Sequence, residues 1–566
     1  MPAFDPQAFK KQFPLFAAEE NLQLIYLDNA ATTQRPQPVI DAIARFYATT
    51  NANTHRSSHR LARRATAMVE TTRAKAAAFV GATGPEEIVF TRGATEALNL
   101  LAHSLGAKLQ PGDEVLLSTA EHHANLVPWQ MLAQRQQLVL RFVPEEQGLP
   151  RFDQLTQCLN ERTRVVSLTA GSNALGFAPD MEIIRAQLVP WRQQLTFILD
   201  AAQLAAHQPL DVKQLDCDFL VCSAHKFYGP TGIGLLYGRS RALAELPPWL
   251  GGGEMIEQVQ LESSTYAAPP HRFETGTSAL AAIAGLDAAF DFLQRLDRAA
   301  MVAYETALTT YLHQQLGTVT GINLLTRSAN NLGIAALVPD ERSGLTPTDL
   351  AHLLDEKDIA VRVGHHCAQP LLRSLEMAAT VRVSIAAYNT RDDIDCLTAA
   401  LREILDGCGF LQPAVPVVCA EPESGADTDV FAADVDALSS LSLEHLKQAK
   451  GWQARYRQLM KWGDVISAKP AIRQPANLVP GCESAAWLIH SQKGGTHRFA
   501  IDSESRVVKG LAALLLVLID GRRRDQVELV RLETTFAELG LDKHLSPSRS
   551  NGFRALLNKA LNCIQG

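Results

Sequence analysis

The sequence has few cysteines and no long apolar run. Nine cysteines in 566 residues, none of them in a Cys-x-x-Cys pair, exclude a disulfide scaffold and a zinc site of that spacing. The longest apolar run, residues 511–519, is far shorter than the about 20 residues that a membrane-spanning helix needs. The N-terminus, MPAFDPQAFKKQF, lacks the apolar segment of a secretory signal. These absences predict a cytoplasmic protein with reduced thiols.

Neither sign of charge dominates. The 53 basic and 60 acidic residues give a net charge of −7, which excludes a broad basic face for nucleic acid. The composition, 46% hydrophobic and 20% charged, is that of an ordinary globular protein. No lysine or arginine occurs between Arg402 and Lys447, and this stretch is rich in proline, acids and small residues. It predicts a linker over residues 410–431.

Short apolar runs alternate with amphipathic stretches between Glu86 and Tyr237, which favours an α/β fold with a largely parallel sheet. The predicted strands are EIVFTR, EVLLSTA, RVVSLTA, TFILDAA, DFLVCSA and GIGLLYG. We expect a large domain over about 27–279, a small α+β domain over about 280–409 that includes the N-terminal segment, and a separate C-terminal α+β domain over 432–566.

Polar groups follow four of these strands, where parallel sheets bind ligands. Gly93, Ala94 and Thr95 open a helix, whose free N–H groups can cradle an anion or can simply form a helix cap. Asp200 ends an apolar strand, where it is either a cap or the partner of a buried cation. Lys226 follows another strand, and a buried lysine can form a Schiff base, although a lone lysine is more often solvated. Together, the lysine, carboxylate and anion cradle are the groups that pyridoxal 5′-phosphate needs.

A series of short motifs, spread along about two-thirds of the chain, extends this interpretation. They are YLDNAATTQRP, THRSSHR, FTRGATEALNL, AEHHANLVPW, SNALG, DAAQ, SAHKFYGPTGIGLLYG, GGGEM, HRFETGT, AVRVGHHCAQPLL and VRVSIAAYNT. In these motifs the chain resembles the group II cysteine desulfurases, SUF/CSD type, of the class V aminotransferase family. The resemblance implies a pyridoxal-phosphate enzyme of fold type I.

The resemblance also implies roles for individual residues. Lys226 is the Schiff-base lysine, Asp200 pairs with the pyridinium nitrogen, and Arg382 binds the substrate carboxylate. The remaining cofactor-binding residues are Ala94, Thr95, His123 (stacked on the ring), Asn173, Gln203, Ser223, His225 and Thr277 (from the neighbouring subunit), and the other substrate-binding residues are Asn29 and His55. Ala94, Ala201 and Ala224 depart from the family pattern, and the loss of a hydroxyl at Ala94 removes one phosphate hydrogen bond.

Cys367 lies in the polar loop VRVGHHCAQP. A zinc site built from His365, His366 and Cys367 is one reading, but no fourth ligand is apparent, so we expect no metal. Neighbouring histidines and Arg362 favour a thiolate at Cys367. The resemblance makes Cys367 the nucleophile that takes sulfur from L-cysteine as a persulfide while L-alanine leaves.

Cys482 lies in LVPGCESAAWLIH, where composition alone leaves a buried structural cysteine as reasonable as a reactive one. WQARYRQLMKWGD, NLVPGCESAAWLI, VVKGLAALLLVLIDG and LGLDKHLSPSRSNGF resemble the SufE/CsdE sulfur-acceptor family. The resemblance makes Cys482 the sulfur acceptor. Glu483 replaces the commoner glutamine, and Arg549 matches a family motif without an assigned role.

The sequence thus predicts a homodimeric cysteine desulfurase fused to its own acceptor, which supplies sulfur to an iron–sulfur scaffold or another sulfur-accepting protein. Three alternatives stay open. They are a selenocysteine lyase with the same pocket, an aminotransferase of the same fold, and a desulfurase whose C-terminal domain only docks partners.

Overall fold

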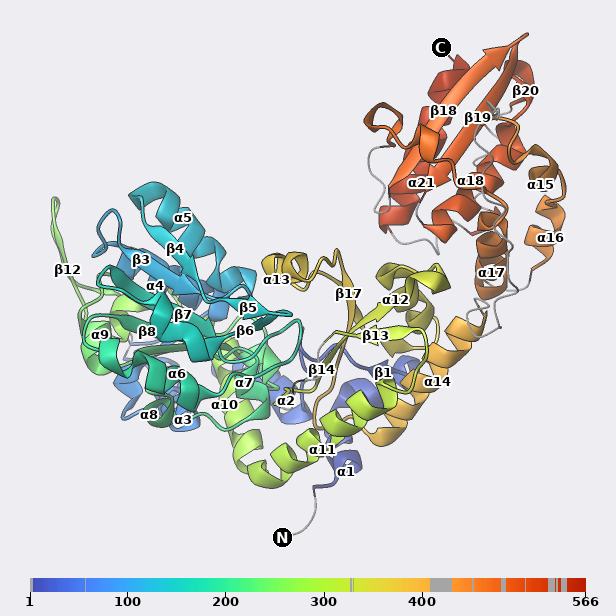
Figure 1. Ribbon diagram of the computed structural model, residues 1–566. Helices are drawn as coiled ribbons and strands as arrows, with labels where there is room; N and C mark the ends of the chain where they lie inside the picture. Colours follow the sequence, from blue (N-terminus) through green and yellow to red (C-terminus); the bar gives the residue numbers. More distant parts are fainter. Residues whose placement is uncertain are drawn as a thin grey trace. The chain divides into compact units, whose positions relative to one another are not determined.

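The structure is a computed structural model that forms two compact units (Figure 1). The first unit holds residues 1–318, 324–337 and 358–398, and the second holds residues 319–323, 338–357 and 399–566. The described residues are 4–55, 58–325, 328, 330–407, 430–449, 452–479, 485–503, 505–527, 535, 538–540 and 547–565. Nearly all of the predicted linker, together with Cys482 and Glu483, lies outside the described residues, as does the side chain of Arg549.

A seven-stranded sheet forms the centre of the first unit, in the order β2-β10-β9-β8-β7-β3-β4. The neighbouring pairs from β9 to β4 are parallel, whereas β10 is antiparallel to both β9 and β2. The prediction of a largely parallel sheet is confirmed. The strands are β2 (Ile88–Thr91), β3 (Glu114–Leu117), β4 (Val139–Phe142), β7 (Thr163–Thr169), β8 (Thr196–Asp200), β9 (Phe219–Ser223) and β10 (Gly234–Gly238).

Helices cover both faces of this sheet (Figure 1). Because successive strand residues point to opposite faces, neighbours such as Ile198 and Leu199 of β8 enter different hydrophobic cores. Burial on both sides explains why these strands read as continuous apolar runs. One core includes α4 (Ala94–Gly106) and α5 (Val127–Gln136), and the other includes α3 (Arg60–Val80), α6 (Met181–Leu188) and α10 (Leu280–Gln294).

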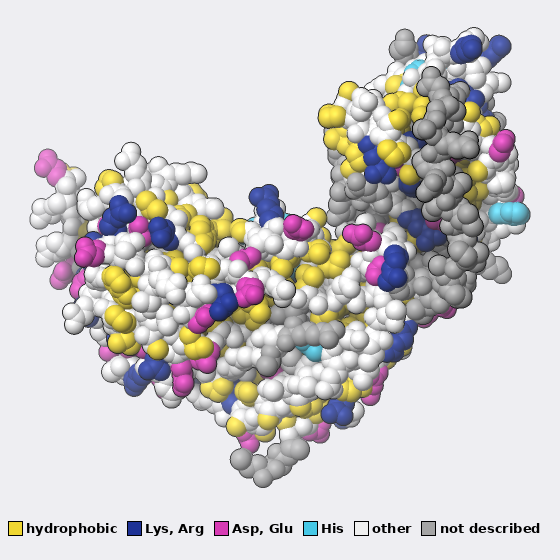
Figure 2. Space-filling view, viewed as in Figure 1, with side chains coloured by type: hydrophobic (Ala, Val, Ile, Leu, Met, Phe, Trp, Pro, Cys, Tyr) yellow, Lys and Arg dark blue, Asp and Glu magenta, His cyan; other side chains and the backbone are white. Residues whose placement is uncertain are grey.

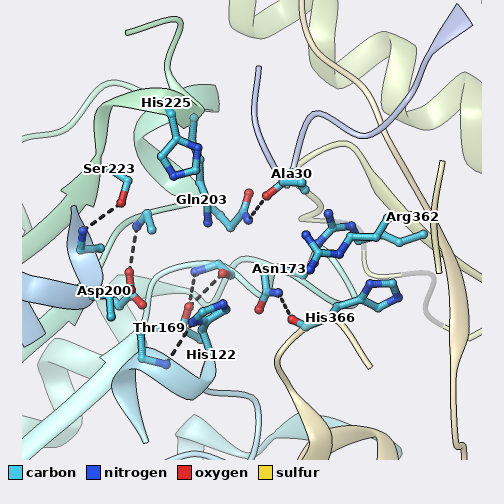
Figure 3. A pocket seen from close by; sticks show the side chains of 18 residues that line it. Ala30, His122, Thr169, Asn173, Asp200, Gln203, Ser223, His225, Arg362 and His366 are labelled. Carbon is cyan, nitrogen blue, oxygen red and sulfur yellow. Dashed lines mark hydrogen bonds between the residues drawn. The ribbon is translucent and has the colours of Figure 1, made fainter. Parts of the chain in front are cut away.

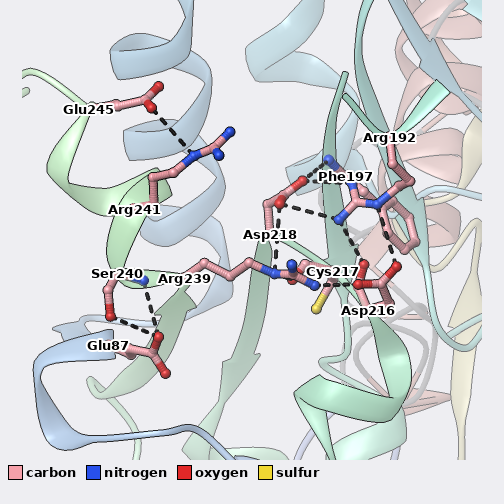
Figure 4. A network of polar contacts seen from close by, with 10 residues as sticks. All are labelled: Glu87, Arg192, Phe197, Asp216, Cys217, Asp218, Arg239, Ser240, Arg241 and Glu245. Atoms are coloured by element: carbon pink, nitrogen blue, oxygen red, sulfur yellow. Dashed lines mark hydrogen bonds and ion pairs between the residues drawn. The ribbon is translucent and has the colours of Figure 1, made fainter. Parts of the chain in front are cut away.

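Ion pairs secure the amino ends of β8 and β9 (Figure 4). One carboxylate oxygen of Asp218, Oδ2, accepts hydrogen bonds from Arg192 Nη1 and from the backbone N–H of Phe197, both at 2.8 Å. Arg239 Nε donates to the carbonyl of Cys217 at 2.9 Å. Burial raises the pKa of the Cys217 thiol to about 12, so this cysteine is chemically inert. The network holds the amino ends of β8 and β9 together. This keeps their carboxyl ends, at the opposite edge of the sheet, in register.

A smaller antiparallel sheet supplies two arginines. β17 (Thr380–Ser384) pairs with β14 (Ile334–Pro339) and β16 (Arg362–Gly364), and Arg362 lies directly opposite Arg382. The N-terminal strand β1 (Ile25–Tyr26) pairs in parallel with β15 (Ile359–Ala360).

The second unit contains an antiparallel hairpin packed on helices, as expected for a separate C-terminal α+β domain. Gly510 of α18 approaches α17 so closely that a Cβ there would lie 2.1 Å from the carbonyl oxygen of Leu459, so this helix crossing requires glycine. The elements are α12 (Pro347–Asp355), α15 (Val435–Ser439), α16 (Leu443–Gln448), α17 (Trp452–Gly463), β18 (Ala486–Lys493), β19 (Thr496–Ser503), α18 (Arg506–Ile519), β20 (Arg522–Arg523) and α21 (Pro547–Gln565).

Basic and acidic side chains are interspersed on the face of the molecule shown in Figure 2, in line with the balanced composition. Within the described part of the chain, none of the helices has both the length and the apolar character to cross a bilayer. The same residues contain no group of three or more histidine, cysteine, aspartate or glutamate side chains arranged to hold a metal ion.

Candidate functional site

A cavity of about 160 Å³ lies at the carboxyl ends of β7, β8 and β9, beside the start of α4 (Figure 3). This volume is more than ten times what a single water molecule requires, so the cavity has room for an organic ligand. Nine of the predicted site residues line it, namely Ala94, Thr95, Asn173, Asp200, Gln203, Ser223, His225, Lys226 and Arg382.

Lys226 and Asp200 are an oppositely charged type of pair, a base and an acid, that line the cavity together. Asp200 is 5% exposed, and its Oδ1 accepts a hydrogen bond from the N–H of Ala202 at 3.0 Å. Burial raises the pKa of Asp200, and the nearby Lys226 opposes this rise. Burial lowers the pKa of Lys226 to about 8, and Asp200 opposes this fall. At pH 7 roughly a tenth of this lysine is therefore neutral, far more than of a solvated lysine with an ordinary pKa.

The start of α4 forms the anion-binding side of the cavity. The N–H of Ala94 donates to Ser223 Oγ at 2.8 Å, whereas the N-cap residue of this helix, Gly93, makes no side-chain cap. Thr95 and His225 complete this wall. Uncapped N–H groups together with the helix dipole favour a phosphate. A Cβ at Gly234 would lie 2.5 Å from the Cα of Gly93, so glycine at position 234 lets the start of β10 meet the turn before α4.

A buried guanidinium lies at the opposite side of the cavity. Arg382 is 1% exposed; its Nη2 donates to Asp28 Oδ1 at 2.9 Å, and its Nη1 donates to the carbonyl of Asn173 at 2.8 Å. Its Nε is buried and has no hydrogen-bond partner among the described residues. Such an unsatisfied donor is unfavourable unless a ligand supplies the acceptor. Arg362 lines the same side.

The two adjacent histidines that follow β3 have different surroundings. His122 lines the cavity, and burial followed by the charge of Lys226 lowers its pKa to about 3, so its ring is neutral. His123 is not among the lining residues. Its N–H donates to the carbonyl of Cys367 at 2.8 Å, and its Nε2 accepts from the N–H of Gln369 at 3.2 Å. The ring that faces the cavity is thus that of His122, whereas the sequence pointed to His123.

Cys367, whose carbonyl accepts the hydrogen bond from the N–H of His123, is half-buried and does not itself line the cavity. Its backbone has a φ of 56°, and that of His366 has a φ of 52°, so two successive residues are left-handed. The thiol lies close enough to Lys226 to raise the pKa of that lysine against the effect of burial. The cysteine therefore belongs to the same electrostatic environment as the cavity.

Three other predicted residues lie outside the cavity lining. Asn29 is buried, and its Nδ2 donates to the carbonyl of Ser384 at 2.7 Å. His55 is exposed, and its ring contacts that of His271. Thr277 is exposed.

The residues that the sequence assigned to cofactor or substrate did not include several that line the cavity, which are His122, Thr169, Gly171, Arg362 and His366. Thr169 and Gly171 could have been found, since they end or follow a predicted strand in the same way as Asp200. Arg362 and His366 come from a distant part of the chain, and no local signal directs them to this cavity.

Comparisons with known proteins agree with this geometry. Residues 25–397 match the aminotransferase class-V family, and residues 441–562 match the SufE family, described as an Fe-S metabolism associated domain. A probable cysteine desulfurase of Mycolicibacterium paratuberculosis is 44% identical over 407 residues, which cover 71% of this chain. The chain spans only 59% of the length of that relative.

Two further relatives are matched almost completely. A cysteine desulfurase of Serratia proteamaculans is 43% identical over 71% of this chain and 98% of its own. The crystal structure of the cysteine desulfurase CsdA from Escherichia coli, in an S-sulfonic acid form, aligns with a TM-score of 0.65 and 38% identity over 72% of this chain and 99% of that chain. The cofactor of the class V family is pyridoxal 5′-phosphate, as the resemblance implied. The chain belongs to the class V aminotransferase family and continues into a SufE domain.

Proposed function

We propose that this chain is a cysteine desulfurase that carries its own sulfur acceptor. It converts L-cysteine to L-alanine, holds the sulfur as a persulfide on Cys367, and passes it to Cys482. The observation that carries the proposal is the single cavity that unites Lys226, Asp200 and Arg382 beside the Cys367 loop. The SufE match over residues 441–562 supports the second step.

The residues present fit pyridoxal 5′-phosphate. The start of α4 and the hydroxyl of Ser223 suit its phosphate, Asp200 suits its ring nitrogen, and the unsatisfied Nε of Arg382 leaves a donor for an acidic substrate. When bound, the cofactor withdraws electrons from the substrate Cα and makes the Cα proton acidic. His122 would stack on the ring, and its place in the cavity lining supports this assignment over His123.

Lys226 holds the cofactor and then moves the proton of the substrate Cα. A pKa near 8 suits a general base at neutral pH, because the amine accepts a proton without being fully protonated beforehand. The carboxyl group of Asp200 would face the lysine and the ring nitrogen, and the nearby Lys226 opposes the rise in its pKa that burial causes. His122 and His225 stay neutral because burial lowers the pKa of the former to about 3 and of the latter to about 4.

The sulfur transfer balances without an added oxidant. Cys367 Sγ attacks the substrate Sγ, the substrate Cβ–Sγ bond breaks, and its electron pair stays on Cβ. Cβ then takes a proton, Cα regains the proton that Lys226 removed, and L-alanine leaves. Cys367 then carries the persulfide. Cys482 Sγ attacks the outer sulfur in the same way, and Cys367 returns to a thiol.

The proposed assembly is a homodimer, in which Thr277 serves the neighbouring subunit's cofactor, a role compatible with its exposure. A linker over residues 410–431 keeps the acceptor at a high effective concentration. The final recipient is an iron–sulfur scaffold or another sulfur-accepting protein.

The test follows sulfur through the purified holoenzyme. After addition of L-cysteine, alkylation and digestion, mass spectrometry is expected to find persulfide on both Cys367 and Cys482. Cys367→Ser should remove both modifications, whereas Cys482→Ser should remove only its own. Absence of persulfide on Cys367 would refute the desulfurase, and persulfide on Cys367 alone would refute the relay.

Arg382→Lys is expected to raise the KM for L-cysteine by about 10- to 100-fold with a smaller change in kcat. Lysine keeps the charge but loses the planar fork that binds a carboxylate, and a charged hydrogen bond contributes about 1.5–3 kcal/mol. Steady-state kinetics measure this. Arg362→Lys is the matched control because Arg362 lines the same cavity; if only the control raises KM, the carboxylate site is at Arg362 instead.

A further inference from the structure

The loop that carries Cys367 has an unfavourable backbone. His366 and Cys367 have φ values of 52° and 56°, in the left-handed region that residues other than glycine rarely adopt. Neither residue is glycine or asparagine, and they are consecutive. Such conformations persist only where surrounding contacts hold them, and they concentrate at functional sites. The contacts that hold this loop therefore decide where the thiol lies.

Side-chain and backbone groups from outside the loop bind its backbone on both sides of the thiol. Asn173 Nδ2 donates to the carbonyl of His366 at 2.6 Å. The N–H of His123 donates to the carbonyl of Cys367 at 2.8 Å. His123 Nε2 accepts from the N–H of Gln369 at 3.2 Å. His123 thus contacts the loop twice, once before and once after Ala368.

The loop also makes two contacts through its own histidines. The N–H of Cys367 donates to His365 Nδ1 at 3.1 Å, and His366 Nε2 lies 2.8 Å from Thr380 Oγ1. The ring of His123 lies against that of His365, with centroids 5.5 Å apart. These local contacts shape the turn, whereas His123 ties the turn to the end of β3 beside the cavity.

We propose that His123 is a positioning residue for sulfur abstraction, which clamps the Cys367 loop against the cofactor side of the cavity. The proposal rests on the proposed function, in which Cys367 receives the substrate sulfur. The two adjacent histidines then have different roles: His122 contacts the cofactor, and His123 positions the loop that carries the nucleophile. The Nε2 of His123 acts as an acceptor only when the ring is neutral. Burial and the neighbouring His365 lower the pKa of His123, which supports that state.

His123→Ala removes the acceptor for the N–H of Gln369 but keeps the backbone bond to Cys367. We expect persulfide formation on Cys367, measured in a single turnover of the holoenzyme, to slow by roughly tenfold, as for the loss of one hydrogen bond. In the same variant, alkylation of Cys367 by iodoacetamide in the absence of substrate should become several-fold faster, because the half-buried thiol is released. Cofactor absorbance should be unchanged.

Three comparisons make the test specific. His123→Gln keeps an acceptor near the position of Nε2 and should recover most of both effects. His103→Ala changes an exposed histidine on α4 and should match the wild type. Cys158, which is also half-buried, is an internal standard, because its alkylation rate rises only if the fold as a whole loosens.

Wild-type rates of both alkylation and persulfide formation in His123→Ala would overturn the proposal. So would loss of cofactor absorbance in that variant, since His123 would then serve the cofactor. If the wild type itself forms no persulfide, the proposed function fails, but faster alkylation of Cys367 in His123→Ala would still support the clamp.

Discussion

Lys226→Ala is expected to lower the turnover of L-cysteine by about 10²–10⁴-fold, the range that a positioned general base contributes. Burial that lowers the pKa of Lys226 to about 8 prepares the amine for proton transfer, and alanine has no group that can replace it. The cofactor would also lose its covalent attachment, so its visible absorbance should change and dialysis should remove it more readily. Steady-state kinetics and absorbance spectra of the dialysed protein measure the two effects.

Two control variants separate chemistry from charge. Lys226→Arg keeps a cation in the cavity, but a guanidinium stays protonated at neutral pH and cannot act as a base. It should lose as much activity as the alanine variant. Lys213→Ala alters an exposed lysine on the short helix α8 (Val212–Leu215) and should leave activity unchanged. Turnover above a tenth of the wild-type rate in both Lys226 variants would contradict the assigned role.

The sheet was largely predictable because its strands are buried on both faces. The six predicted strands correspond to β2, β3, β7, β8, β9 and β10, since continuous apolar runs between helical patterns leave few alternatives. The strand that was missed, β4 (Val139–Phe142), lies at the edge of the sheet and is mostly exposed, and its apolar run is interrupted by Arg141. Its pairing with β3 in the folded chain defines it as a strand.

Much of the cavity was predictable for a related reason. Parallel strands end at one edge of the sheet, so Asp200, Ser223 and Lys226 had to meet there. The choice between His122 and His123 could not be made, because the chain turns between them. His122 is extended, with a ψ of 146°, and His123 begins the 3₁₀ turn η4 (His123–Asn125). Adjacent residues at such a turn point in different directions, and sequence spacing does not show which one faces the ligand.

The division of the chain into its two compact units could not be predicted from the local sequence either. Segments of the predicted small domain, including α12, group with the C-terminal part of the chain, whereas Arg362 and Arg382 group with the large sheet. Such grouping depends on contacts between residues far apart in the chain. Propensity and periodicity describe only the local chain.

Glu121, directly before the two histidines, is a fully buried acid that the sequence analysis passed over. It is 0% exposed. Ser118 Oγ donates to its Oε1 at 2.5 Å, the N–H of Thr169 donates to the same atom at 3.0 Å, and Asn125 Nδ2 donates to Oε2 at 2.6 Å. Burial outweighs these three bonds and raises the pKa of Glu121 to about 8, and the nearby Asp200 adds to the rise. The side chain therefore lies beneath the cavity as a neutral acid at neutral pH.

This raised pKa makes stability depend on pH in a definite direction. Between the ordinary value of 4.5 and about 8, the folded protein holds a proton on Glu121 that the unfolded chain has released. Its contribution to the free energy of unfolding is complete below pH 4.5 and is lost as the pH rises, by up to about 1.4 kcal/mol per pH unit. Glu121→Gln keeps the shape, has no proton to lose, and should gain stability relative to the wild type as the pH rises from 5 to 8.

Denaturant unfolding of the holoenzyme at several pH values, followed by a probe of the first unit, measures this difference. Glu114→Gln is the matched control, because Glu114 is 1% exposed but has Arg162 at 3.6 Å and Arg141 at 4.0 Å. Its replacement breaks these ion pairs and should destabilise the protein without a gain at higher pH. If Glu121→Gln destabilises the protein equally at every pH, Glu121 is ionised in the fold, and a second negative charge lies beside Asp200. The neutral form instead leaves Asp200 as the acidic group that faces Lys226 among the residues that line the cavity, which is the arrangement that the proposed chemistry requires.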